Sequence, residues 1–106
     1  MGKYEREKGA RFERALANYF RERGYDARRG QQFCGLHGDA DVVGLPGVHI
    51  EAKAVERLNL AEAYAQSVRD AKEDEVPVVI HKRLRGPVMI TLELSDFMKY
   101  YEGKND

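Results

Sequence analysis

Three charged residues near the middle of the chain have the types and spacing of a site for a divalent cation. Asp41 lies ten residues before Glu51, and Lys53 follows Glu51 by two positions. Mg²⁺ takes carboxylate and carbonyl oxygens and keeps several waters, so Asp41, Glu51 and the backbone carbonyl of Ala52 would suffice as protein ligands. A lysine beside the ion would orient the attacking water or stabilise charge on a phosphoryl group. The pattern is therefore compatible with metal-assisted hydrolysis of a phosphodiester.

Other interpretations fit the same part of the chain. From spacing alone, an Asp, a Glu and a Lys in a hairpin also suit a solvated face with cross-strand ion pairs. Asp39 is an alternative to Asp41 as the acidic partner. A zinc site is disfavoured because the three histidines lack the spacing of zinc ligands: His37, His49 and His81.

These residues are expected in a hairpin over residues 39–54 that turns at Pro46 and Gly47. Pro46 fixes φ at the first central position of a type II turn, and Gly47 supplies the positive φ required at the second. Alternate side chains of a strand share a face. The apolar face, which is expected in the core, carries Val48, Ile50, Ala52 and Ala54. The opposite face carries His49, Glu51 and Lys53.

A third carboxylate comes from a predicted amphipathic helix over residues 3–23, which Gly24 would end. Its apolar side chains recur at helical spacing: Phe12, Ala15, Leu16, Tyr19 and Phe20. At about 100° per residue, Glu13 borders this apolar face instead of lying on the solvent side. Glu13 can therefore reach across the edge of the sheet, although its position also suits an ordinary boundary residue that makes an i,i+4 contact.

A second helix is predicted from Asn59 to about Asp74. Asn59 can cap its first N–H groups, and Glu62 stands three residues later, as in a capping box. The expected buried stripe consists of Ala61, Tyr64, Ala65, Val68 and Ala71. A helix of this length can return the next strand parallel to the strand that holds Glu51.

The remaining segments complete a single domain over residues 1–106. A short strand is predicted at 25–29, a glycine-containing loop at 30–38, and β-branched strands at 77–82 and 88–92. Ser95 is expected to cap a C-terminal helix. The element order is thus αβββαββα, an α/β (α+β) fold in which helices flank a mixed central sheet.

Composition and charge limit the classes of function. The chain has 42% hydrophobic and 34% charged residues and no apolar run of the roughly 20 residues that span a bilayer. The chain starts without a signal-like apolar segment, so a cytoplasmic protein is expected. Cys34 is its single cysteine, so no intrachain disulfide is expected. The net charge is zero, but residues 1–30 carry +4 and residues 31–80 carry −5. The basic start, with the later group Lys82, Arg83 and Arg85, suits contact with phosphates.

Taken together, Asp41, the Glu51-Ala52-Lys53 triplet and Glu13 resemble the PD-(D/E)xK nuclease superfamily. The order of elements is similar to the αβββαβ core of restriction endonucleases. Within the superfamily, residues 5–92 look most like archaeal-type Holliday junction resolvases and phage-encoded VRR-type nuclease domains. The chain departs from the pattern in two places, since Ala40 replaces a proline before the acid and the loop at 30–38 is longer.

The resemblance implies a role for each matching residue. Asp41 and Glu51, with the Ala52 carbonyl, would hold Mg²⁺ or Mn²⁺, and Lys53 would be the catalytic lysine. The resemblance favours Asp41 over Asp39, because the family's acid precedes a small apolar strand. Three further positions match the family pattern. Glu13 would help to bind metal or position water, and Gln66 would lie near the site. An arginine of the first strand, Arg28 or Arg29, would contact DNA.

The expected function is therefore a metal-dependent endonuclease that cuts branched DNA, such as a Holliday junction or a flap, without a small-molecule cofactor. The resemblance implies a homodimer, with residues 88–101 as the pairing surface, and allows a phage or prophage origin. A restriction-type nuclease for ordinary duplex and a non-catalytic nucleic-acid-binding module are the alternatives.

Overall fold

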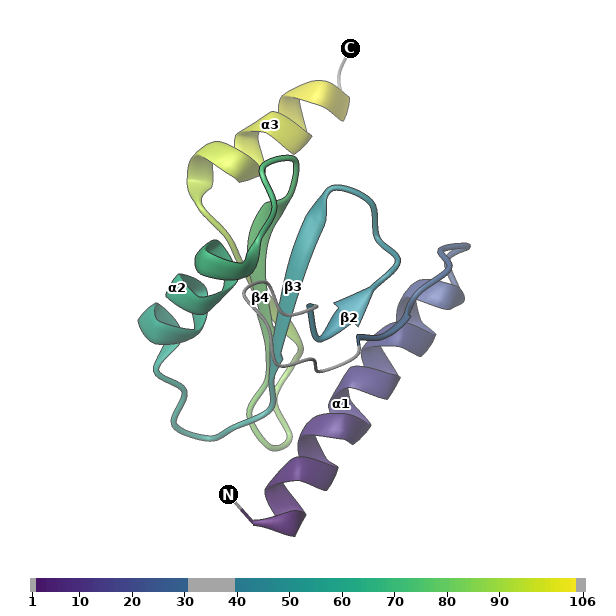
Figure 1. Ribbon diagram of the computed structural model, residues 1–106, viewed down its shortest axis with the longest axis vertical. Helices are drawn as coiled ribbons and strands as arrows, with labels where there is room; N and C mark the ends of the chain where they lie inside the picture. Colours follow the sequence, from purple (N-terminus) through teal and green to yellow (C-terminus); the bar gives the residue numbers. More distant parts are fainter. Residues whose placement is uncertain (1, 31–39, 105–106) are drawn as a thin grey trace.

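The computed structural model describes residues 2–30 and 40–104. It is a five-stranded sheet with three helices (Figure 1). The helices are α1 (Lys3–Arg21), α2 (Leu60–Asp70) and α3 (Leu94–Lys104). The strands are β1 (Arg28–Arg29), β2 (Val42–Val43), β3 (Val48–Lys53), β4 (Val76–His81) and β5 (Met89–Thr91). The predicted loop at 30–38, together with Asp39, Cys34 and His37, lies almost entirely outside the described residues.

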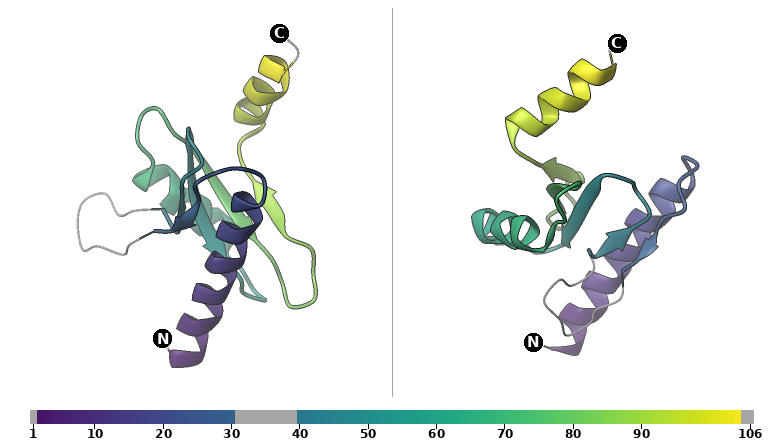
Figure 2. Two further views of the ribbon diagram at one scale, coloured as in Figure 1. Left: turned by 90° about the vertical axis from the view of Figure 1, so that its right-hand side faces the viewer. Right: turned by 45° about the horizontal axis from the view of Figure 1, so that its top comes forward.

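The strands lie side by side in chain order, β1-β2-β3-β4-β5. β3 and β4 are parallel because α2 carries the chain back between them, whereas the other neighbouring pairs are antiparallel. α1 and α2 lie on opposite sides of the sheet (Figure 2). The predicted order αβββαββα and the mixed sheet are thus confirmed.

The turn between β2 and β3 needs two glycines. Gly47 has φ +84°, as the predicted turn requires, and Gly44 has φ +107°. A Cβ on Gly44 would lie 2.6 Å from the Cα of Ala27, in the segment leading into β1. The hairpin therefore packs directly against this segment, which fixes β1 and β2 relative to each other.

The main core lies between α1 and one face of the sheet. It is made of Phe12, Leu16, Ala17, Ala27, Val42, Ile50, Ala52, Val78 and Ile80. The predicted apolar face of β3 is confirmed, because Ile50 and Ala52 are buried here and Val48 and Ala54 pack against them. Of the stripe predicted for α1, Ala15 and Tyr19 are exposed instead of buried. They lie beside an open groove between α1 and β5 that no element covers within the described chain.

α1 ends at Arg21, two residues before the predicted position, and Gly24 terminates it as predicted. The N–H of Gly24 donates to the carbonyl of Arg21, and the N–H of Tyr25 donates to the carbonyl of Phe20. Gly24 has φ +94°, so the end of the helix is a Schellman motif with glycine at the position that needs a left-handed residue.

α2 covers the other face of the sheet, through a different stripe from the predicted one. Asn59 caps the helix as expected, accepting a hydrogen bond from the N–H of Glu62. The residues buried against the sheet are Ala63 and Ser67, whereas Val68 and Ala61 of the predicted stripe are exposed. Small side chains let the helix approach the strands closely.

α2 ends at Asp70, four residues before the predicted position. The Ser67 hydroxyl, which is fully buried, lies 3.1 Å from the His49 carbonyl oxygen and 3.2 Å from that of Val78. It thereby ties the last turn of the helix to both central strands. The chain then leaves the helix at Ala71, which adopts an extended conformation.

α3 extends away from the sheet (Figure 2). Ser95 lies inside the helix and bonds to the Glu93 side chain, so the prediction that Ser95 caps it is wrong. The helix instead begins directly after Glu93, whose carbonyl accepts a hydrogen bond from the N–H of Phe97. Within the described part of the chain, no helix has the length and apolar character to cross a bilayer.

Candidate metal centre

The pairing of β2 with β3 brings Asp41 beside the middle of β3. The Asp41 N–H donates to the Ile50 carbonyl at 2.9 Å. In return, the Ala52 N–H donates to Oδ2 of Asp41 at 2.8 Å. The Asp41 side chain is thus held against the β3 backbone by a hydrogen bond to Ala52, next to Glu51.

Glu51 is almost completely buried, with 2% of its surface exposed. Burial raises its pKa, and so do the negative charge of Asp41 and a hydrogen bond between the two carboxyl groups. A hydrogen bond to His49 acts in the opposite direction but does not cancel this rise. The expectation that these charges form a solvated strand face therefore does not hold for Glu51.

The backbone of Ala52 faces the same side as the Asp41 carboxylate. Ile50 presents its carbonyl to β2, and backbone groups two residues apart in a strand point the same way. The Ala52 N–H bond to Asp41 confirms this direction. The Ala52 carbonyl therefore lies on the side of β3 where β2 begins and where Asp41 offers its carboxylate.

Glu13 reaches the same place from α1. Its side chain is 13% exposed, and its Oε1 lies 3.0 Å from Nε of Arg29 in β1. Burial raises the pKa of Glu13, as does the charge of Asp41, whereas Arg29 and Lys53 lower it. Both Asp41 and Lys53 are thus near enough for their charges to act on Glu13, which matches its predicted place at the edge of the apolar face.

These contacts define an acid–lysine cluster: Glu13, Asp41, Glu51 and Lys53, with Arg29 paired to Glu13. Its members come from α1, the start of β2 and the end of β3. Glu51 is buried and the neighbouring Asp41 is half-buried, so their negative charges repel each other, and a bound cation would relieve that repulsion. The donor set of carboxylates plus a backbone carbonyl is the one that Mg²⁺ or Mn²⁺ prefers, so the residues fit such an ion.

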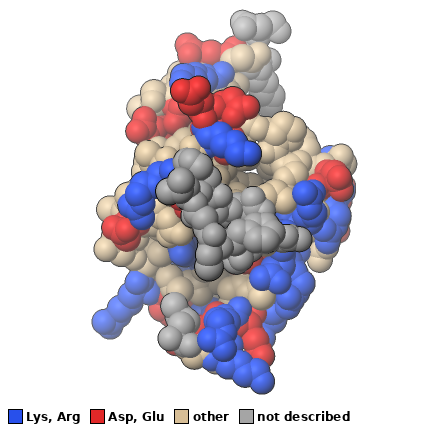
Figure 3. Space-filling model, viewed as in Figure 1, with Lys and Arg blue, Asp and Glu red and all other residues tan. Residues whose placement is uncertain are grey.

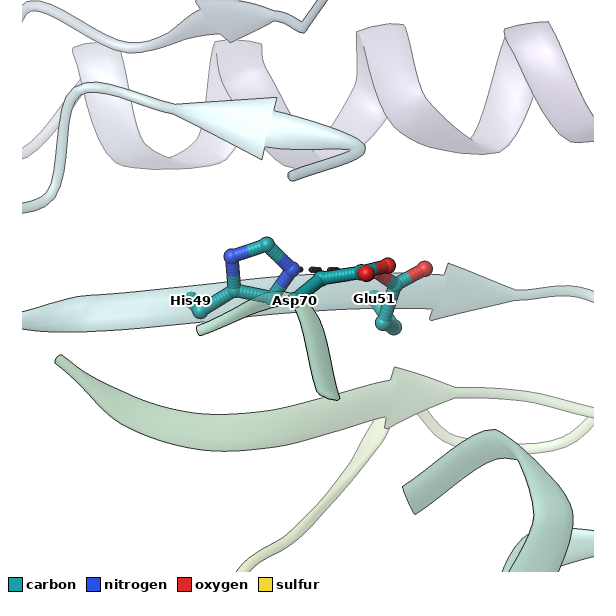
Figure 4. Close-up of side chains that lie close together, drawn as sticks. All are labelled: His49, Glu51 and Asp70. Carbon is teal, nitrogen blue, oxygen red and sulfur yellow. Dashed lines mark hydrogen bonds and ion pairs between the residues drawn. The ribbon is translucent and has the colours of Figure 1, made fainter. Parts of the chain in front are cut away.

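A second set of charged groups lies on the α2 side of Glu51. His49 is two residues before Glu51 on the same face of β3, is 3% exposed, and has Nε2 3.0 Å from Oε1 of Glu51. Its Nδ1 lies 3.7 Å from Oε1 of Glu75. Asp70, at the end of α2, points towards the same place (Figure 4). We call His49, Glu51 and Asp70 the histidine cluster.

The charges around His49 decide its protonation. Burial acts to lower the pKa of His49, but the hydrogen bond and charge of Glu51, with the charges of Glu75 and Asp70, raise it overall. The neighbouring carboxyl groups therefore stabilise the imidazolium form of His49 relative to that of an isolated histidine.

The other predicted site residues are outside these two clusters, although the N–H of Lys82 donates to the carbonyl of Lys53 at 3.1 Å. Gln66 is half-buried on α2 and makes no hydrogen bond to either cluster among the described residues. Three basic residues lie in or beside the turn between β4 and β5: Lys82, Arg83 and Arg85. Arg28, next to Arg29 in β1, is exposed.

The sequence interpretation placed His49 on the correct face of its strand but assigned it no role, and it did not consider Asp70 and Glu75. The signal for His49 was available, because positions two apart in a strand share a face and Glu51 was already singled out. No comparable signal existed for Asp70 or Glu75, whose approach depends on where α2 ends.

Comparison with protein-family models, with curated proteins and with solved structures found no match to this chain.

Proposed function

We propose that this protein is a metal-dependent DNA endonuclease with a restriction-endonuclease-like core of the PD-(D/E)xK type. The observation that carries the proposal is the convergence of Glu13, Asp41 and Glu51, with Lys53, from three separate elements. The pKa values of Glu13 and Glu51 are both raised, which costs folding free energy, and such groups are typical of a functional site.

In this proposal, Asp41, Glu51 and the Ala52 carbonyl hold Mg²⁺ or Mn²⁺. The bound ion would supply Lewis-acid polarisation of a phosphoryl oxygen and a more acidic water. Lys53 stabilises the negative charge that builds on the phosphoryl group, and Glu13 positions the attacking water. Arg29 holds Glu13 in place through their ion pair.

The surface offers phosphate contacts beside this cluster. Basic side chains gather along the side of the molecule formed by α1 (Figure 3). α1 carries Lys3, Arg6, Lys8, Arg11, Arg14 and Arg21. Arg28 and the group of Lys82, Arg83 and Arg85 extend the set of candidate DNA contacts. Such contacts read the DNA backbone and not the bases, so we propose that the protein recognises DNA shape and that its substrate is branched DNA. We further propose that two copies of the chain act as a homodimer.

The test is cleavage of a labelled four-way junction and of a linear duplex of equal length, each with Mg²⁺, with Mn²⁺ and with EDTA. We expect metal-dependent cleavage of the junction in preference to the duplex. Asp41→Asn, Glu51→Gln and Lys53→Met should each lower the rate by more than about 100-fold. The exposed residue Asp74 provides a matched control for the carboxylate substitutions, because Asp74→Asn should cleave like wild type.

Equal cleavage of duplex and junction would favour the restriction-type alternative. Absence of cleavage on both substrates, or unchanged rates in the three variants, would contradict the proposal. A non-catalytic binding module would bind the junction without cleaving it and would lack an Mn²⁺ site that depends on Asp41.

A further inference from the structure

The histidine cluster brings three metal-binding atoms together on the side of Glu51 that faces α2. One nitrogen of His49 and one carboxylate oxygen each from Glu51 and Asp70 lie within 4.8 Å of one another. Two of the three residues are at most 3% exposed, so this is not a group of solvated surface charges. Figure 4 shows the three side chains directed towards one another from β3 and from the end of α2.

The spacing suits coordination of one ion. Ligands about 2.0–2.1 Å from a tetrahedral ion are about 3.4 Å apart. Nε2 of His49 and Oε1 of Glu51 are already 3.0 Å apart, so small side-chain movements would suffice. The hydrogen bond between them would be replaced by two bonds to the ion.

The second nitrogen of His49 is oriented as in known metal-binding histidines. Such a histidine almost always directs its other ring nitrogen to a carboxylate, a carbonyl or a water, which fixes the ring and makes the ligating nitrogen more basic. Nδ1 of His49 lies 3.7 Å from Oε1 of Glu75, beyond a direct hydrogen bond but within ion-pair distance. Glu75 therefore lies beside Nδ1, the ring nitrogen that does not contact Glu51, and can serve as this outer partner of the ring.

A pocket gives access to the cluster. It has a volume of about 290 Å³ and is lined by His49, Asp70 and Glu75, with Lys72 and the β2–β3 turn at its edge. Three protein ligands beside an open pocket leave a coordination position for water or for a ligand atom.

We propose that His49, Glu51 and Asp70 bind a transition-metal ion of the Zn²⁺ class, at a site distinct from the oxygen-only position beside Asp41. The imidazole nitrogen makes the difference, because nitrogen ligands favour Zn²⁺, Co²⁺ or Ni²⁺ over Mg²⁺. This goes beyond the proposed nuclease function, which requires only the Asp41 side of Glu51. The site stands even if the protein cuts no DNA.

The experiment uses Co²⁺ as the probe, since its visible absorption reports ligand type and coordination number. Metal-free protein comprising residues 1–106 is titrated with Co²⁺ in the presence of excess Mg²⁺. We expect one equivalent of Co²⁺ to give strong d–d bands in wild type. His49→Gln and Asp70→Asn should abolish these bands. Glu75→Gln should weaken Co²⁺ binding by about 10-fold or more. Asp41→Asn should bind Co²⁺ like wild type. Asp74→Asn is the matched surface control.

Circular dichroism establishes that each variant is folded. If His49→Gln does not fold, Asp70→Asn alone tests the site, because it changes a half-buried side chain at the end of a helix. Bands that persist in Asp70→Asn, or that disappear in Asp41→Asn alone, would place the ion elsewhere and overturn the inference. Absence of bands in wild type would overturn it as well. The nuclease proposal is judged separately, by Mg²⁺-dependent DNA cleavage, so either can fail without the other.

Discussion

At the scale of single residues, Glu51 lies between two sets of partners. On one side is the Asp41 carboxylate, which raises the pKa of Glu51, and on the other is His49, whose Nε2 is hydrogen-bonded to Oε1 of Glu51. Only 2% of its surface is exposed, so its partners rather than solvent decide its charge. Substituting Glu51 should therefore disturb both clusters, whereas substitutions at Asp41 and at Asp70 should separate them.

The raised pKa of Glu13 predicts a pH-dependent stability that one substitution removes. Below the ordinary pKa of 4.5, Glu13 is protonated in both states. As pH rises above that value, the folded state holds its proton longer than the unfolded state, so the free energy of unfolding falls until the folded pKa is passed. In the Glu13→Gln variant, the amide does not titrate but can still accept a hydrogen bond from Arg29.

The measurement is urea unfolding of wild type and Glu13→Gln in EDTA between about pH 4 and about pH 8. The stability of wild type relative to the variant should decrease over the lower part of this range and then level off. A difference that stays constant with pH, or that grows as pH rises, would contradict the assignment.

Part of this site could be predicted from the sequence and part could not. The apolar spacing around Phe12 placed Glu13 correctly at the edge of the buried face, and strand alternation placed Glu51 opposite Ile50. The closeness of Asp41 to Glu51 depends on the register that pairs Val42 with Ile50, which no local pattern specifies.

At the scale of elements, α2 shows why a helix can be predicted correctly while its buried face is predicted wrongly. Hydrophobicity favoured the stripe that includes Val68, but this side chain is 49% exposed. The face that packs on the sheet is the one with the smaller residues, Ala63 and Ser67, because they allow the helix to approach β3 and β4 closely. Tertiary packing thus overrode hydrophobic periodicity, although the cap at Asn59 was predicted correctly.

Ser67→Ala tests the link between α2 and the two central strands. The substitution removes a buried hydroxyl that bonds to the carbonyls of His49 and Val78. We expect a loss of about 1 kcal/mol in the free energy of unfolding, measured by urea denaturation. Ser95→Ala, which changes the other serine at an exposed position on α3, should cost less than about 0.5 kcal/mol. Equal effects of the two substitutions would contradict the role given to Ser67.

Gly44→Ala and Gly47→Ala form a second matched pair in the β2–β3 turn. Both positions have positive φ, so each alanine adds backbone strain of about 1–2 kcal/mol. Only at Gly44 would the new Cβ overlap the backbone of Asp26 and Ala27, whereas nothing lies within 4 Å at Gly47. Thermal or urea unfolding should therefore show clearly greater destabilisation for Gly44→Ala, and the reverse order would exclude this packing.

At the scale of the whole molecule, the C-terminal part is the least covered. α3 has four large apolar side chains that are between 47% and 74% exposed: Leu94, Phe97, Tyr100 and Tyr101. An apolar groove of about 610 Å³ lies open between α1 and β5. In a two-fold dimer, α3 of each copy can cover the groove of the other copy. The proposed homodimer would be formed in this way.

The oligomeric state tests this arrangement. We expect light scattering after size-exclusion chromatography to give twice the chain mass of 12.1 kDa for wild type. Phe97→Asp, on the exposed face of α3, should give the monomer mass. Tyr4→Asp, at a 68% exposed position on α1, is the control and should remain dimeric. A monomeric wild type, or a dimeric Phe97→Asp variant, would exclude α3 as the pairing surface.

The crossover between β3 and β4 also sets an order in time. Asp41 and Glu51 belong to one hairpin, and the first helix that packs against it precedes both in the chain. During synthesis at about 5–20 residues per second, Asp70 leaves the ribosome roughly 1–4 seconds after Glu51. Hairpins form within microseconds, so the oxygen ligands can meet before the histidine cluster has its third member. In the two proposals, the oxygen ligands of Mg²⁺ would therefore come together first during synthesis, and a transition metal would bind only after Asp70 has joined the histidine cluster.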